Sequence, residues 1–128
     1  MRVTIDDIEV MGVVAEGGPP GAPAAFETLD ARIGSPRGRR FYGTYDGREY
    51  RACVAIQEGD DPHALGLTTW RIGGGEYERT KLTDWQERIE EIGPTFDAMA
   101  AGCEPDYARP CIEFYRSSRE LLLLLPVK

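Results

Sequence analysis

Five consecutive leucines, Leu121–Leu125, stand near the end of a chain in which 29% of the residues are charged. A strand that is apolar at every position, rather than at every second one, is normally covered on both faces. The run is far too short to cross a bilayer, which needs about 20 apolar residues. It therefore predicts a strand at the centre of a sheet, and Pro126 should end the pairing because proline has no N–H to donate. Helices are expected on one face of this strand; the partner half of the chain, a second subunit or a ligand cleft remain open as cover for the other.

The rest of the chain predicts two similar series of elements. The first half, about residues 1–60, predicts a strand, a helix and a hairpin, at 7–18, 22–34 and 39–57. The second half, about 67–128, predicts a strand with three glycines, two short helices and a hairpin, at 67–82, 83–92, 94–102 and 109–127. Asp46-Gly47 is the pair that a tight hairpin turn favours, and "GREYRACVAI" aligns with "SRELLLLLPV". These patterns predict one α+β domain over residues 1–128 with an internal duplication.

Length and charge restrict the function. A chain of 128 residues fits one domain, and its net charge of −7 argues against a nucleic-acid partner, which needs a clustered basic surface. The basic stretch 35–40 contains proline and glycine and predicts a turn with solvated arginines. Acidic residues interrupt the N-terminal apolar stretch, so a signal peptide is not expected. Three cysteines without close spacing suit a reducing compartment. We therefore expect a cytoplasmic protein that engages neither nucleic acid nor membrane.

Glu113 is the unusual residue of the last hairpin. It lies between Ile112 and Phe114, so alternation along a strand places it with Cys111 and Tyr115 on one face. If Ile112 and Phe114 face the helices, Glu113 faces away from them. An ordinary surface carboxylate is one interpretation. The other is a single carboxylate in an apolar cleft, because an exposed leucine face beside it would be a costly apolar patch.

A carboxylate in such a cleft would favour a cationic ligand. Burial raises the pKa of a carboxyl group, and an approaching cation lowers it again. Aromatic rings add a cation–π attraction of roughly 0.5–2 kcal/mol each. The candidate ligand-binding residues are Glu113, Tyr115, Tyr77, Trp70 and Tyr45. For each aromatic residue, packing in the core or in a hairpin is an equally good interpretation, and Trp85 is expected in the core.

The sequence offers little other catalytic equipment. Its one histidine, His63, lies in the polar stretch 58–66. No nucleophile elbow and no phosphate-binding glycine pattern occur. One histidine and scattered cysteines do not supply a zinc set. No cofactor or metal is expected, and catalytic residues cannot be assigned.

Three segments carry a resemblance to a known family. The end "PCIEFYRSSRELLLLLPVK" resembles the closing motif of the GyrI-like small-molecule-binding domain, also described as the bacterial transcription-activator effector-binding domain. "RFYGTYDGREYRACVAI" is similar to the first hairpin of that family. "IGGGEYERTKL" is similar to its Gly-x-Tyr strand, with Gly75 and Tyr77 in the family's places. The resemblance covers essentially the whole chain.

The resemblance implies a duplicated strand-helix-strand-strand unit with pseudo-twofold symmetry. It also implies an antiparallel sheet with helices on one face and a ligand cleft between the halves. Members bind hydrophobic, often cationic or aromatic compounds, including multiple drugs, and some take part in transcription regulation. The acidic residue of their last hairpin lies in the cleft in several members, and Glu113 matches it.

Three functions follow as hypotheses. The first is a stand-alone domain that captures a hydrophobic, cationic or aromatic molecule for sensing or sequestration. The second is a hydrolase of reactive cyclopropane-bearing electrophiles, with Glu113 as acid or base on water. The third is a protein that inhibits gyrase through an acidic surface. A protein partner and a homodimer remain open.

Overall fold

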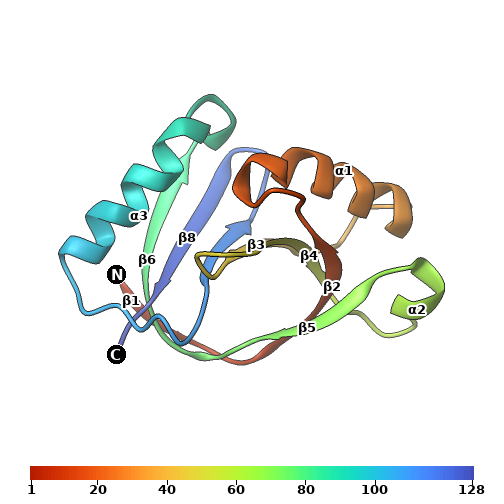
Figure 1. Cartoon of the computed structure of the whole chain (residues 1–128), viewed down its shortest axis with the longest axis horizontal. Coiled ribbons are helices and arrows are strands. Elements are labelled where there is room, and N and C mark those ends of the chain that lie inside the picture. The colour runs from red at the N-terminus through yellow and green to blue at the C-terminus, as the bar shows by residue number, and fades with distance from the viewer.

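A computed structural model describes residues 1–128 as an α+β protein with one eight-stranded antiparallel sheet (Figure 1). The strands follow one another across the sheet in the order β1-β6-β8-β7-β3-β4-β2-β5. The strands are β1 (Arg2–Ile5), β2 (Ile8–Val14), β3 (Phe41–Tyr45), β4 (Tyr50–Ala55), β5 (Thr68–Ile72), β6 (Gly75–Thr83), β7 (Cys111–Tyr115) and β8 (Glu120–Pro126). The helices are α1 (Ala22–Ile33), the single turn α2 (Pro62–Leu65) and α3 (Ile92–Ala101).

The leucine run forms β8, which pairs with β6 on one side and β7 on the other. Leu121, Leu123 and Leu125 pack in the core beneath α3. Leu122 and Leu124 pack in a second core on the opposite face of the sheet. The predicted central strand, covered on both faces, is confirmed.

Helices α1 and α3 lie on the same face of the sheet and splay apart above it (Figure 1). The core beneath α1 contains Ala25 and Leu29 from the helix and Met11 and Val54 from the strands. On the helix Ala25 and Leu29 are one turn apart, so they share the face that meets the sheet. Each helix therefore has its own core, and the strands between the two helices are left uncovered by either.

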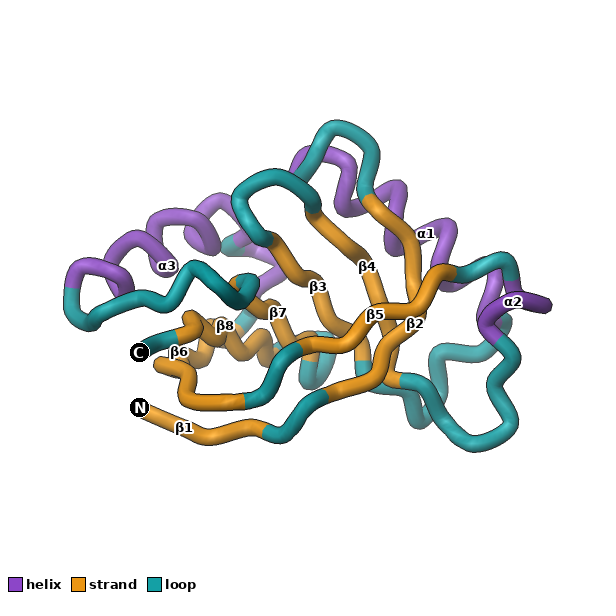
Figure 2. The backbone as a smooth tube through the Cα atoms, turned by 60° about the horizontal axis from the view of Figure 1, so that its bottom comes forward, coloured by secondary structure: helices purple, strands orange, loops and turns teal.

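The sheet curls because two long, broken strands run alongside each other. β1 pairs with β6, β2 pairs with β5, and a single antiparallel register runs through both pairs, with Arg2 opposite Glu78 and Ile8 opposite Ile72. Figure 2 shows these four segments side by side along the edge of the molecule opposite α1 and α3. The core inside the curl receives side chains from both ends of the sheet, including Val10, Ile72 and Tyr77.

The break in each long strand explains the glycines of the 67–82 segment. Gly73 and Gly74 separate β5 from β6, and Asp6 and Asp7 separate β1 from β2. The backbone N–H of Gly74 donates to Oδ1 of Asp7 at 2.6 Å. A Cβ at Gly74 would lie 2.6 Å from the carbonyl oxygen of Ile5, so a side chain has no room there. The close approach of two backbones is what requires glycine.

The expected helix over 83–92 is wrong. β6 continues through Thr83, which pairs with Glu120, and Asp84 then takes a left-handed conformation with φ of 55°. Its N–H donates to the carbonyl oxygen of Arg119 at 2.6 Å, which holds it to the hairpin instead of a helical turn. Two 3-10 turns, Trp85–Glu87 and Ile89–Glu91, lead into α3.

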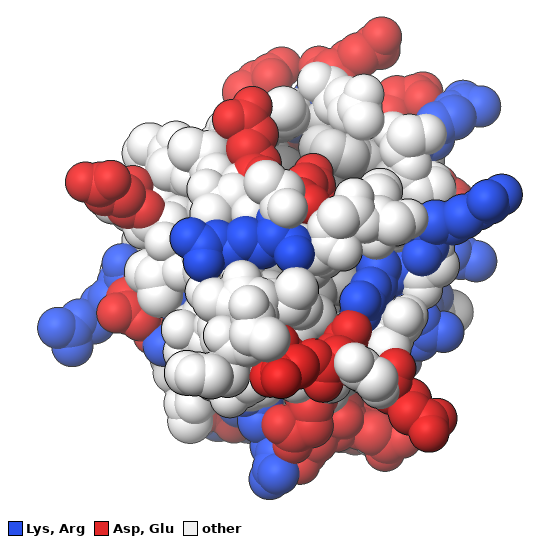
Figure 3. Space-filling model, turned by 90° about the vertical axis from the view of Figure 1, so that its right-hand side faces the viewer, with Lys and Arg blue, Asp and Glu red and all other residues white.

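No large basic patch is visible on the side of the molecule that carries α2 (Figure 3). There, Lys and Arg side chains lie at several places among acidic and uncharged surface, some of them close together at the right-hand edge of the view, and acidic side chains gather along the bottom (Figure 3). No helix in the structure has both the length and the apolar character needed to cross a membrane.

Candidate functional site

A cavity of about 1080 Å³ lies between α1 and α3, over the strands that neither helix covers. Its floor comes from β3 and β7, which pair so that Phe41 lies opposite Tyr115 and Tyr45 opposite Cys111. Because side chains alternate along a strand, these residues and Glu113 face the same side. Its volume is just above the range that small-molecule sites usually occupy, roughly 300–1,000 Å³.

Glu113 lies at the centre of this floor and accepts two short hydrogen bonds. The hydroxyl groups of Tyr50 and Tyr115 both donate to its Oε1, each at 2.5 Å. Oε2 accepts no hydrogen bond, yet it is not among the buried polar atoms that lack a partner. Oε2 is therefore not fully buried, and it opens into the cavity that Glu113 lines.

Burial sets the protonation of all three groups. It raises the pKa of Glu113, and the hydrogen bonds from Tyr115 and Tyr50 offset only part of that rise because they favour the ionised form. Burial, followed by the charge of Glu113, raises the pKa of Tyr50 and of Tyr115 well above that of free tyrosine. Both phenols keep their protons at neutral pH and act as donors. The same two effects raise the pKa of Cys111 to about 11, so its thiol is not a ready nucleophile.

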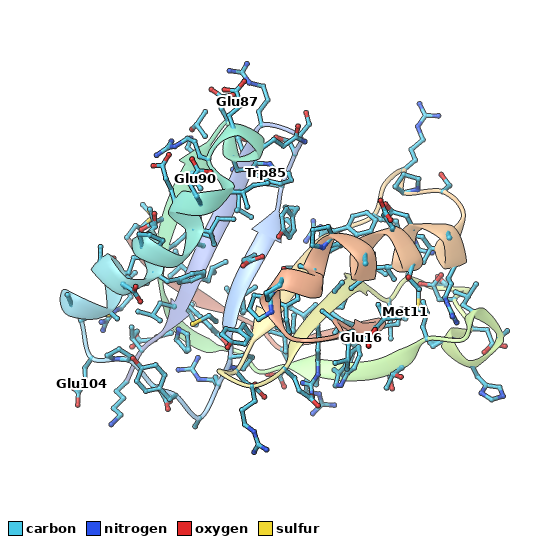
Figure 4. The ribbon with its side chains drawn as sticks, turned by 45° about the horizontal axis from the view of Figure 1, so that its top comes forward. Met11, Glu16, Trp85, Glu87, Glu90 and Glu104 are labelled. Atoms are coloured by element: carbon cyan, nitrogen blue, oxygen red, sulfur yellow. The ribbon has the colours of Figure 1, made fainter.

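Aromatic rings surround the carboxylate. The ring of Phe26, from α1, meets the ring of Tyr115 edge to face at 5.2 Å, and the ring of Trp85 meets it at 5.0 Å. The indole N–H of Trp85 donates to the carbonyl oxygen of Ser117 at 3.1 Å, which fixes the ring against the last hairpin. In Figure 4, Trp85 is directed toward the strands, whereas Glu87 and Glu90 from the same turns point away from the molecule.

The other charged groups of the lining are mostly acidic. They are Asp30, Asp46 and Asp97, together with Arg109. Arg109 is already engaged: its Nη2 donates to the carbonyl oxygen of Val127 at 2.9 Å, and its guanidinium lies 4.7 Å from the ring centre of Tyr77. The cavity therefore offers carboxylates and aromatic rings to a ligand, a combination that suits a cation and disfavours an anion. The chain has no group of three or more His, Cys, Asp or Glu side chains that could hold a metal ion.

The structure separates the five residues that the sequence suggested. Glu113, Tyr115 and Tyr45 line the cavity. Tyr77 and Trp70 lie on the opposite face of the sheet, in and against the core inside the curl. Tyr77 is fully buried and donates to the carbonyl oxygen of Gly73 at 2.6 Å, so its role there is packing at the strand break. Trp70 lies beneath the guanidinium of Arg51, 4.9 Å away.

The condition under which Glu113 would face away from the helices is not met. Ile112 and Phe114 pack inside the curl, so Glu113 is on the face that carries the helices, between α1 and α3. The alternation itself was correctly inferred. Which face meets the helices was left open by the sequence, and Ile112 and Phe114 face inward because the inner face of the curled sheet has an apolar core of its own.

Sequence reasoning missed several cavity residues, among them Tyr50 and Trp85. Tyr50 is the first residue of β4 and pairs with Tyr45 across the hairpin, so the Asp46-Gly47 turn carried a signal for it. Trp85 was assigned to the core of a helix that does not form. A strand that continues to Thr83 would have placed it at the end of a hairpin, next to Ser117.

Comparisons show that this chain shares its fold with several proteins of known structure. No known family matches the chain, and no curated protein sequence matches it. An integron cassette protein from Vibrio cholerae superimposes with a TM-score of 0.77 and 19% identity, over 100% of this chain and 95% of that one. The protein SAV2435 bound to tetraphenylphosphonium superimposes with a TM-score of 0.65 and 13% identity, over 100% and 93%. A hydrolase from Listeria innocua gives 0.61 and 15%, over 100% and 90%. These similarities are compatible with a GyrI-like fold.

Proposed function

We propose that this chain is a GyrI-like small-molecule-binding domain that captures a hydrophobic cation in the cavity between α1 and α3. Residues 1–128 would form one such domain, with two related halves at about 1–60 and 67–128. The sheet order supports this relation. From the outside of the sheet toward its middle, the first half contributes β2, β4 and β3, and the second half contributes the corresponding strands β6, β8 and β7. Glu113 is the central contact, and Tyr115 and Tyr45 contribute aromatic surface beside it.

The observation that carries the proposal is the open Oε2 of Glu113 in an aromatic cavity. Both phenol protons are used on Oε1, so the carboxylate keeps one oxygen for a positive ligand. A cation near Oε2 would stabilise the ionised form that burial disfavours. The structurally similar protein SAV2435 binds tetraphenylphosphonium, a hydrophobic cation.

The test is a fluorescence titration that isolates Trp85. The variant Trp70→Phe removes the tryptophan outside the cavity, so that Trp85 alone reports. We expect saturable quenching by tetraphenylphosphonium and none by tetraphenylborate, which has the same shape and the opposite charge. In Glu113→Gln the affinity for the cation should fall about 10- to 100-fold, the range expected for one lost interaction with a desolvated charge.

Glu87→Gln is the matched control, because it removes one carboxylate at an exposed position outside the cavity. It should bind the cation as the parent variant does. Equal binding of both phenyl ions, or equal affinity in Glu113→Gln, would contradict the proposal.

A hydrolase is the second candidate, and the same group of side chains favours it. An open carboxylate oxygen beside two protonated phenols can take a proton from water while a phenol donates one to a leaving group. The substrate would be an electrophile such as a strained cyclopropane. In that reaction, water adds to a ring carbon as a ring C–C bond breaks, and the water's proton passes to Glu113. The other carbon of the broken bond takes a proton from a phenol, and the proton on Glu113 then passes to the phenoxide that is hydrogen-bonded to it. Mass spectrometry should then detect a product that contains one added water and that is lost in Glu113→Gln.

A further inference from the structure

Gly43 occupies the one position on the cavity face of β3 that carries no side chain. Phe41 and Tyr45, on either side of it, both line the cavity. In the pairing of β3 with β7, Gly43 lies directly opposite Glu113. A missing side chain at this point leaves a gap in the floor beside the central carboxylate.

The phenol of Tyr50 fills that gap. Tyr50 belongs to β4, whereas Glu113 belongs to β7, and β3 lies between these strands. Tyr50 must therefore pass over β3 to reach the carboxylate. A Cβ built on Gly43 would overlap the Tyr50 hydroxyl oxygen, and it would lie 2.7 Å from Cζ of Tyr50 and 2.8 Å from Oε1 of Glu113.

The backbone does not require glycine here. Gly43 is not among the glycines with positive φ, and its strand pairs regularly on both sides. Glycine inside a strand weakens it, because it gains no packing and loses more conformational freedom than other residues on folding. The space that the Tyr50 phenol takes is the feature of this position that excludes a side chain.

We propose that Gly43 is a positioning residue for the site: its missing side chain lets Tyr50 cross β3 and donate to Glu113. Tyr50, Gly43 and Glu113 then act as one unit, while Tyr115 reaches the carboxylate along its own strand. The inference rests on the proposed function only in that it concerns the same carboxylate. It can be tested in the ligand-free protein, so that a failure to bind cations leaves the result unaffected.

The experiment measures the pKa of Glu113 by carbon-13 NMR of labelled glutamate side chains. Gly43→Ala should raise this pKa by about one pH unit, because the ionised carboxylate loses one of its two donors. Tyr50→Phe should raise it by the same amount. The double variant should show no more than either single variant, since both remove the same hydrogen bond.

Gly93→Ala is the matched control. Gly93 also lines the cavity, but a Cβ there meets nothing within 4 Å, so the pKa of Glu113 should stay at its wild-type value. A Gly43→Ala protein that titrates as wild type, or single effects that add in the double variant, would overturn the proposal.

A second measurement covers the case in which Gly43→Ala folds poorly. The loss of thermal stability caused by Gly43→Ala should be smaller in a Tyr50→Leu background, where the outer ring atoms and hydroxyl are absent. An equal loss in both backgrounds would assign the glycine to the strand backbone and overturn the proposal.

Discussion

Glu113 combines two demands that oppose each other. Its position among aromatic rings suits a hydrophobic cation, but the same burial makes its own ionisation unfavourable. Two phenol donors on Oε1 recover part of the lost hydration. Residues that serve binding commonly reduce the stability of the unliganded protein, and Glu113 has the geometry for this.

The raised pKa of Glu113 predicts a pH-dependent change in stability. The folded protein holds this proton to a higher pH than the unfolded chain, whose carboxyl group titrates near the ordinary value of 4.5. The native state therefore binds more protons above that pH, and stability is lost as pH rises toward the folded pKa. Glu113→Gln should be more stable than wild type at pH 7 in urea unfolding, and the difference should vanish at pH 4. A Gln variant that is less stable at pH 7 would contradict this prediction.

At the scale of residues, the sequence predicted a carboxylate beside aromatic rings, but it did not identify which aromatic residues lie near that carboxylate. Glu113 could be identified from the sequence because a carboxylate between Ile112 and Phe114 interrupts an apolar strand. Tyr77 and Trp70 looked equivalent to Tyr115, since alternation gives a side chain a face relative to its strand neighbours only. Which face of a strand meets the cavity depends on the curl of the sheet, and a local sequence pattern does not predict that curl.

Strand β8 contributes side chains to the cores on both faces of the sheet. Its even and odd leucines belong to different cores, and each of the five is at most 8% exposed. The element was predictable, since an unbroken apolar run has few other stable environments. The 3-10 turns before α3 were not, because they depend on the contact between Asp84 and Arg119 across the neighbouring hairpin.

Truncating either face of β8 should destabilise the protein to a similar degree. Leu123→Ala and Leu124→Ala should each lower the free energy of unfolding by about 2–5 kcal/mol, the usual range for a buried leucine. Thr69→Ala, at an exposed position of β5, should change it by less than about 0.5 kcal/mol. Urea unfolding monitored by circular dichroism gives all three values. A small loss at one leucine alone would mean that its face of the strand is poorly packed.

At the scale of the molecule, the paired breaks between β1 and β2 and between β5 and β6 let the sheet curl around an inner core. One side of this break was visible in the sequence as three glycines inside the strand predicted over 67–82. Their partner segment was not identifiable, because Asp6 and Asp7 lie almost 70 positions earlier and pair only in the folded sheet.

Neighbouring glycines at this break should respond differently to the same substitution. Gly74→Ala should lower the free energy of unfolding by about 1–3 kcal/mol, because its Cβ would press on the backbone of Ile5 and Asp7. Gly73→Ala should have little effect, since its nearest contact is a flexible Arg109 carbon at 3.6 Å. Thermal unfolding of the two variants side by side makes the comparison. Equal losses would show that the break needs flexibility at both positions.

The central place of β8 in the sheet has a consequence for biosynthesis. A ribosome delivers the chain from its N-terminus, and β8 is the last strand of this fold to emerge. Until it does, β6 and β7 lack their shared neighbour, α3 has no leucines to cover, and the inner core is open on one side. Domains tend to fold as units, and exposed strand edges favour aggregation in the meantime. A nascent chain of this protein therefore exposes the edges of β6 and β7 until β8 has left the ribosome.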